Sequence, residues 1–119
     1  MYVDGFVLAV PADRIEDYRK MAQKAGDVWM EHGALSFVEC VAEDVPYGEL
    51  TSFPRAVQQK DGETVVFSWI TYKSREDRDA INEKVMADPR LNMDMKDSPF
   101  DGKRMIYGGF RTLVELERG

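Results

Sequence analysis

The chain has 119 residues, of which 44% are hydrophobic and 32% are charged, and its formal net charge is −6. This length predicts one domain, residues 1–119, with enough chain to bury a core. The acidic excess disfavours binding to nucleic acids and to anionic lipids, because both are negatively charged. A lone cysteine cannot form an intrachain disulfide, and no apolar run approaches the ~20 residues of a membrane span. We therefore expect a cytoplasmic protein, and the opening strand pattern indicates no signal peptide.

The first half of the chain has the pattern of a strand, a helix and a strand. Residues 2–10, YVDGFVLAV, predict the first strand, and residues 34–41 predict the second. An acidic cap at Asp13 predicts the start of a helix that ends near His32, with Gly33 as its left-handed stop. Apolar residues recur on this helix at spacings of three and four, which predicts one face packed on a sheet: Ile15, Tyr18, Ala22, Ala25 and Trp29.

The second half repeats that order. Residues 64–72, TVVFSWITY, predict a third strand. Ser74 and Asp77 form a capping box that opens a second helix, and Asp88 before a proline predicts a further short helical turn. Residues 104–117 predict the fourth strand.

This order of elements predicts an α+β fold, the ferredoxin-like split β-α-β β-α-β arrangement, with one four-stranded antiparallel sheet. Right-handed crossovers place the first and third strands in the centre and the second and fourth at the edges. The expected edge strands carry the charges that protect exposed edges: Glu39, Glu43, Arg111 and Glu115.

The central strand patterns are apolar on both faces. In residues 64–72, Phe67 and Trp69 face one side while Val66, Ile70 and Tyr72 face the other. A sheet with helices on one side needs only one apolar face. The second face would leave an apolar patch larger than a monomer usually exposes. We therefore expect a homodimer in which two sheets pair face to face.

Segments across the whole chain resemble the YbaA-like family of small bacterial proteins of unknown function: EHGAL, ECV, TSFP, VFSWI, MADPR and, as the longest, PFDGKRMIYGGF. That family is similar to the dimeric α/β-barrel superfamily, which uses the ferredoxin-like fold. The resemblance implies the same dimer and places ligands between the helices and the sheet. It implies no activity, no cofactor and no catalytic motif, since kinship of fold alone does not define function.

Two ionisable residues are the catalytic candidates. His32, the single histidine, follows the apolar stripe at the helix end, where it either caps the last carbonyls or acts as an acid or base. Asp4 lies on an apolar strand face, where it either pairs with Arg104 or Arg111 or serves as a general base beside a cleft. Cys40 is interpreted as a core residue rather than a nucleophile, and with one histidine we expect no metal site.

Four aromatic residues are candidate walls of an apolar pocket: Trp29, Phe53, Phe100 and Tyr107. The first functional hypothesis is a dimer that binds a small apolar molecule in a cleft between helices and sheet. If the protein transforms this molecule, we expect the reaction to need neither a metal nor a cofactor. The second is a non-catalytic dimeric module, stress-associated or binding a partner through the long loop of residues 43–59.

Overall fold

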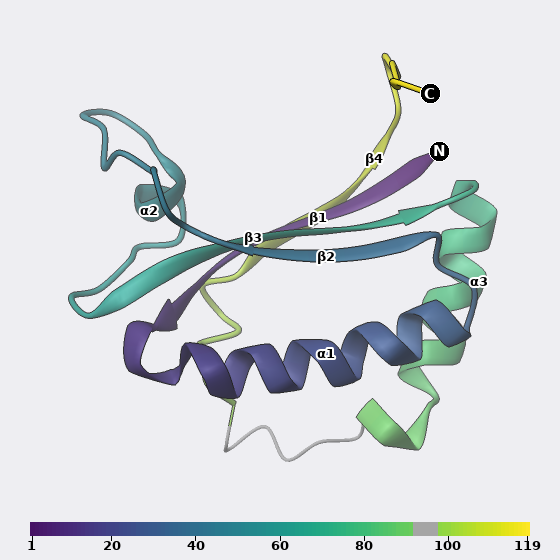
Figure 1. Ribbon diagram of the computed structural model, residues 1–119, viewed down its shortest axis with the longest axis horizontal. Helices are drawn as coiled ribbons and strands as arrows, with labels where there is room; N and C mark the ends of the chain where they lie inside the picture. Colours follow the sequence, from purple (N-terminus) through teal and green to yellow (C-terminus); the bar gives the residue numbers. More distant parts are fainter. Residues whose placement is uncertain (92–97) are drawn as a thin grey trace.

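The computed structural model describes residues 1–91 and 98–119 (Figure 1). Its strands are β1 (Tyr2–Pro11), β2 (Ser36–Val41), β3 (Glu63–Tyr72) and β4 (Ile106–Arg111). Its helices are α1 (Ile15–Glu31), α2 (Phe53–Ala56) and α3 (Arg75–Met86). Two short 3-10 turns follow β1 and α3, namely η1 (Ala12–Arg14) and η2 (Pro89–Leu91).

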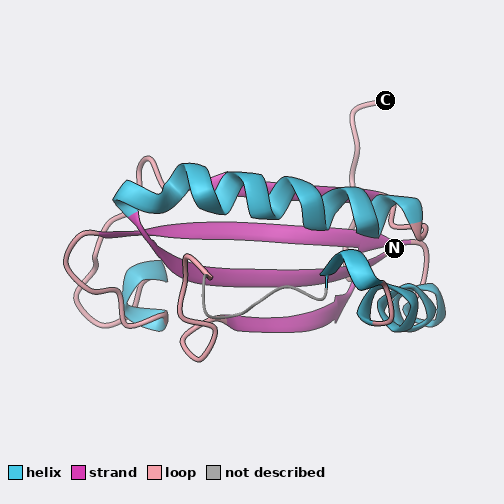
Figure 2. Cartoon of the chain, turned by 90° about the horizontal axis from the view of Figure 1, so that it is seen from below, coloured by secondary structure: helices cyan, strands magenta, loops and turns pink. Residues whose placement is uncertain are grey.

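The four strands form one antiparallel sheet in the order β2-β3-β1-β4. The strands β1 and β3 are central, which confirms the ferredoxin-like arrangement predicted from the order of elements. They pair along their full length, from Tyr2 opposite Tyr72 to Pro11 opposite Glu63. The helices α1 and α3 lie on the same face of the sheet, whereas the opposite face carries only α2 and its loop (Figures 1 and 2).

The helix ends are only partly as predicted. Gly33 has φ +118° and ends α1, and the Ser74 hydroxyl accepts a hydrogen bond from the amide of Asp77 at 3.1 Å, as expected. The expected acidic cap of α1 is wrong, because no side chain caps that helix. Residues 12–14 already form a turn before the helix begins, so Asp13 lies too early to cap it.

The fourth strand is shorter than the predicted 104–117. Its pairing with β1 covers Ile106 to Arg111, and the amide of Thr112 makes the last contact, 3.3 Å from the carbonyl oxygen of Met1. At the other end, Arg104 turns away to form an ion pair with Glu63. Residues 113–119 extend away from the sheet on the side opposite α1 and α3, at the yellow end of the chain in Figure 1.

The core lies on both faces of the sheet. Between the helices and the sheet are two clusters of buried side chains, among them Leu8, Val10, Tyr18, Val28, Ile70, Tyr72 and Val85. On the opposite face, Val57 from the loop after α2 packs on Val7, Ala9 and Val65. Part of the loop of residues 43–59 therefore covers one end of that face. Within residues 1–91 and 98–119, no helix combines the length and apolarity that crossing a membrane requires.

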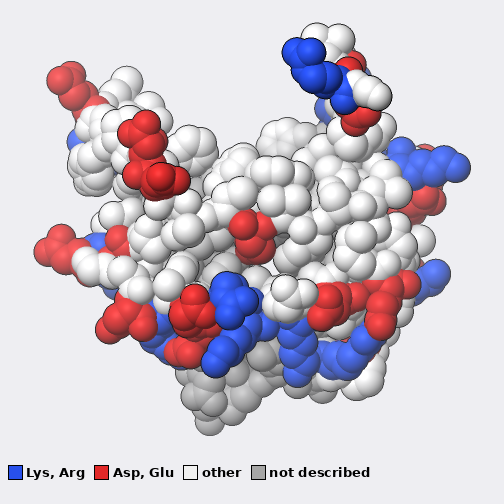
Figure 3. Space-filling model, viewed as in Figure 1, with Lys and Arg blue, Asp and Glu red and all other residues white. Residues whose placement is uncertain are grey.

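The rest of the face opposite α1 and α3, called the open face below, is apolar and exposed. Phe67 is 42% exposed, Ile106 45% and Phe110 63%. Figure 3 shows this side as a hollow between two projections, the loop carrying α2 and the C-terminal segment, and the surface between them is mostly uncharged. Phe67 and Trp69 lie on this face while Val66, Ile70 and Tyr72 lie on the other, so the predicted two-sided pattern is confirmed.

Candidate functional site

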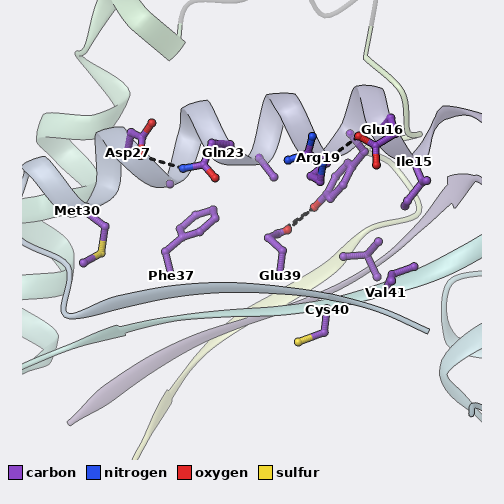
Figure 4. A pocket seen from close by; sticks show the side chains of 14 residues that line it. Ile15, Glu16, Arg19, Gln23, Asp27, Met30, Phe37, Glu39, Cys40 and Val41 are labelled. Atoms are coloured by element: carbon purple, nitrogen blue, oxygen red, sulfur yellow. Dashed lines mark hydrogen bonds and ion pairs between the residues drawn. The ribbon is translucent and has the colours of Figure 1, made fainter. Parts of the chain in front are cut away.

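A groove of about 520 Å³ runs between α1 and the edge strand β2, and a smaller hollow of about 120 Å³ lies further in, between α1 and the sheet. Four residues line both spaces: Tyr18, Ala22, Phe37 and Glu39. The outer groove is seen in Figure 4, where Phe37 and Glu39 rise from β2 toward α1 while Cys40 points away on the other side of the sheet.

Small residues on α1 make room for these spaces. Ala22 and Gly26 face β2, and a Cβ atom added to Gly26 would come within 2.8 Å of the Phe37 ring. The ring of Phe37 can therefore stand against the helix backbone and lie 6.0 Å from the ring of Trp29, measured between centroids. A helix with larger side chains here would be pushed away from β2.

Glu39 and Tyr18 form a polar pair in this apolar layer. The Tyr18 hydroxyl lies 2.6 Å and 2.9 Å from the two carboxylate oxygens of Glu39 and donates to them. Burial raises the pKa of Glu39 above its usual value, although the hydroxyls of Tyr18 and Ser68 favour the ionised form. Burial and the neighbouring carboxylate also raise the pKa of Tyr18, which therefore stays a hydrogen-bond donor. A carboxyl group with a raised pKa beside a cavity can hold or move a proton.

Asp4 lies on the same sheet face, two strands away from Glu39 in the order β2-β3-β1, and is only 6% exposed. Its carboxylate accepts bonds from the guanidinium of Arg78, at 2.9–3.1 Å, and from the Tyr72 hydroxyl, at 3.0 Å. The cation is thus Arg78 of α3 and not Arg104 or Arg111 of the final segment. Gly109, opposite Asp4 in β4, leaves room for it, since a Cβ atom there would overlap the Arg78 guanidinium.

His32 occupies the C-cap position of α1, but its backbone amide and not its ring bonds a carbonyl of the last helical turn, that of Val28, at 3.1 Å. Its Nε2 atom lies 2.9 Å from the Asp88 carboxylate, which also accepts from Arg90. The hydrogen bonds from Arg90 and His32 hold the pKa of Asp88 well below its usual range. His32 does not line either space described above, and its catalytic role stays a prediction.

The predicted aromatic pocket divides between the two faces of the sheet. Trp29 and Phe100 line the inner hollow, and Phe100 lies edge-on to Tyr18 at 5.8 Å between ring centroids. Phe53 lies on the open face against Phe67, at 5.7 Å, so the sheet separates it from that hollow. Tyr107 stacks on Phe6 at the sheet edge and is 72% exposed.

Cys40 and His32 do not form a catalytic pair. Cys40 is exposed on the open face, whereas the His32 ring contacts Asp88 beside the helices. Among residues 1–91 and 98–119, no three side chains of His, Cys, Asp or Glu are grouped closely enough to hold a metal ion.

The sequence prediction missed the pair of Glu39 and Tyr18. Glu39 was interpreted as a protective charge on an edge strand, and Tyr18 as part of the apolar stripe. The sequence did contain a signal. Phe37, Glu39 and Val41 are spaced two residues apart on one strand, so Glu39 shares the helix-covered face with two apolar residues. The same test that singled out Asp4, a carboxylate on an apolar strand face, would have found Glu39.

Solved structures with this fold place the chain in a class of proteins. A dimeric ferredoxin-like protein from an uncultured marine organism matches with a TM-score of 0.68 and 11% identity, over 99% of this chain and 100% of that one. An uncharacterized NIPSNAP domain protein from Burkholderia xenovorans matches with a TM-score of 0.62 and 15% identity, over the same shares of the two chains. These likenesses show a ferredoxin-like fold and nothing about activity.

The sequence comparisons identify the family. The model of the protein family of unknown function DUF1428 matches residues 1–102. An uncharacterized protein, YbaA, from Escherichia coli strain K12 is 56% identical over 114 residues, which cover 96% of this chain and 97% of the relative. YbaA from Shigella flexneri matches to the same extent. This chain belongs to the DUF1428 family, which confirms the YbaA-like resemblance found in its sequence.

Proposed function

We propose that this protein binds a small, largely apolar molecule between α1 and the sheet, with Glu39 and Tyr18 as its polar anchor. The observation that carries the proposal is the position of this hydrogen-bonded pair, which lines both the outer groove and the inner hollow. Ligand sites are typically apolar hollows with a few converging polar groups. Any reaction at this site would use the Glu39 carboxyl to take up or release a proton, without a metal.

Binding is tested with N-phenyl-1-naphthylamine, a neutral apolar fluorophore. We expect saturable fluorescence enhancement with one site per chain, abolished by Ala22→Phe, because Ala22 lines both spaces and a benzyl group there would project between the groove and the hollow. Lys20→Phe places the same side chain on the exposed side of α1 and should leave binding unchanged. Equal binding by the two variants would contradict the proposal. Native mass spectrometry followed by denaturation of the same sample would, in addition, detect a ligand that copurifies.

The second part of the proposal is a homodimer formed through the open face. Its support is the exposure of Phe67, Ile106 and Phe110 on a mostly uncharged surface, and the fold it shares with a protein described as dimeric. Each such side chain is about half exposed and would gain about half of the roughly 1.5–3 kcal/mol that full burial of an exposed side chain provides. Stable interfaces bury about 1,200–2,000 Å² in total, so the proposed dimer requires about half of that area from each protomer.

The dimer is tested by placing a charge on the open face. Phe67→Asp should convert a native mass of two chains to that of one chain, with the circular dichroism of the folded protein retained. The matched control is Tyr107→Asp, because Tyr107 is an exposed aromatic residue on the helix-covered side of the sheet. A wild-type monomer, or an unchanged Phe67→Asp dimer, would overturn this part of the proposal.

A non-catalytic module that binds a partner through residues 43–59 is the second candidate function. It is favoured by two exposed side chains in that loop, Leu50 at 90% and Tyr47 at 57%. The Arg55 side chain lies over the Tyr47 ring, 4.1 Å from its centroid, and bonds the carbonyl of Gly48, so the loop has a defined shape. If the fluorophore does not bind, this candidate takes precedence.

A further inference from the structure

We propose that the ligand of this site is an apolar organic cation, a protonated amine on an aromatic or alkyl body, and that Glu39 is its counter-ion. The inference rests on the proposed function, because it names the class of molecule that the groove and the inner hollow accept. It follows from a difference between Glu39 and the other shielded carboxylates of the chain.

Each of those other carboxylates has an arginine. Asp4 is paired with Arg78 at 2.9 Å, and Glu63 with Arg104 at 2.7 Å. Asp88 is paired with Arg90 at 2.8 Å. Glu39 is bonded only by hydroxyls, and no Lys or Arg among the described residues forms an ion pair with it. A half-buried carboxylate without a cation is costly, so a ligand that supplies the missing positive charge gains the most from this site.

The charges along the groove also favour a cation. Three carboxylates line it, namely Glu16, Asp27 and Glu39, with one guanidinium, that of Arg19. The Arg19 guanidinium is already paired with Glu16 at 2.9 Å (Figure 4). Asp27 accepts a hydrogen bond from the Gln23 amide, which is neutral and does not compensate the charge of the Asp27 carboxylate. An anionic ligand would meet two such carboxylates, whereas a cation would be attracted by both.

The remaining lining suits the apolar body of such a ligand. Ile15, Met30, Phe37, Val41 and Val66 contribute apolar groups to the groove. Phe37 and Tyr18 present aromatic rings next to the Glu39 carboxylate, and aromatic rings attract organic cations through their π faces. A strongly hydrated inorganic ion would gain little from these walls. An amine on a hydrocarbon body would use the rings and the carboxylate together.

The proposal implies a definite pH dependence. Only ionised Glu39 can act as counter-ion, and burial raises its pKa, so binding of an amine should tighten as the pH rises through that value. The groups that face Glu39 are Tyr18 and Ser68, with Glu16, Arg19 and Asp27 along α1. Tyr18 stays protonated throughout, because burial and the Glu39 carboxylate raise its pKa. Glu16 and Asp27 have exposed side chains and are unchanged in Glu39→Gln. The difference in pH dependence between wild type and Glu39→Gln therefore isolates the contribution of Glu39.

The experiment compares three probes with the same aromatic body and different charge: phenethylamine, phenethyl alcohol and hydrocinnamate. Binding to the full chain is followed by nuclear magnetic resonance, through the shifts of backbone amides along α1 and β2. At pH near 7 we expect the amine to bind roughly tenfold more tightly than the alcohol, and the carboxylate to bind most weakly. Glu39→Gln should remove most of the amine's advantage over the alcohol, while Glu43→Gln, an exposed control, should leave that advantage unchanged.

Each outcome has a distinct meaning. Equal affinity of wild-type protein for the amine and the alcohol overturns the inference but leaves the apolar site of the proposed function in place. Tighter binding of hydrocinnamate overturns the inference as well. If neither the three probes nor the fluorophore binds, both the inference and the proposed binding site are overturned. Should Glu39→Gln fold poorly, a pH series on the wild-type chain decides, because an amine affinity that does not rise between about pH 4.5 and 7 contradicts a Glu39 counter-ion.

Discussion

Asp4 and Glu39 lie on the same face of the sheet, each among apolar neighbours, yet their surroundings differ. Asp4 is bonded by Arg78 of α3 and by the Tyr72 hydroxyl, and it lines neither of the two spaces beside α1. Among the residues that the structure describes, Glu39 is bonded by hydroxyls and by no Lys or Arg, and it borders two hollows. The first is a closed ion pair that fixes α3 to the sheet, and the second is an open site. A buried carboxylate therefore indicates a ligand site only where its charge lacks a partner within the chain.

Breaking the closed pair should have the largest effect. We expect Arg78→Ala to lower the free energy of unfolding by about 3–5 kcal/mol, because it leaves the buried Asp4 charge without a cation. Urea denaturation measures the loss. Arg75→Ala is the matched control: Arg75 faces Asp79 at 3.8 Å on the surface of the same helix and should contribute less than about 1 kcal/mol. Equal losses for both variants would show that Asp4 does not need this partner.

Glu63 offers a second closed pair with a measurable pH signature. Its hydrogen bond from Arg104 lowers its pKa to about 2, so the pair stabilises the folded chain above the usual glutamate pKa and loses this contribution as the pH falls through about 2. Glu63→Gln should cost about 2–3 kcal/mol near pH 7 and very little near pH 2. Unfolding curves at both pH values test this, with exposed Glu49→Gln as control. A pH-independent cost would argue against an ionic contribution.

Glu39 should behave in the opposite way. Its pKa is raised in the folded state, so the folded chain binds its proton more tightly and ionised Glu39 costs stability at neutral pH. We expect Glu39→Gln to stabilise the free protein by about 1 kcal/mol near pH 7, with the gain shrinking as the pH falls below the Glu39 pKa. Thermal denaturation over a pH series measures it. A loss of stability at pH 7 would mean that the carboxylate is compensated after all.

The smallest effect is expected at His32. Its ring bonds Asp88, and its side chain is 26% exposed, so His32→Ala should cost on the order of 1 kcal/mol. Since His32 does not line the groove, fluorophore binding and the native mass should stay as in wild type. Lys24→Ala, an exposed substitution on the same helix, serves as control. Loss of fluorophore binding in His32→Ala would instead extend the site to the end of α1.

The sequence predicted only part of the candidate site. The strand pattern showed that Asp4 is on an apolar face and needs a partner, but it pointed to the nearest strand in the sheet rather than to α3. Arg78 lies 74 residues away in the chain, and only the packing of α3 beside the end of the sheet brings it to Asp4. The aromatic residues illustrate the same limit: Trp29 and Phe53 were grouped by chemistry, and the sheet separates them.

The sequence by itself determined the order of the elements, the central and edge strands, and the two apolar faces, because these depend on local periodicity and on the handedness of crossovers. Only the tertiary structure decided which charges meet and which stay unpaired. Those outcomes depend on distances between side chains from separate elements, and periodicity within one element contains no such distances. The position of the Glu39 carboxylate beside the groove is therefore a property of the folded chain, although both residues of its pair are plain in the sequence.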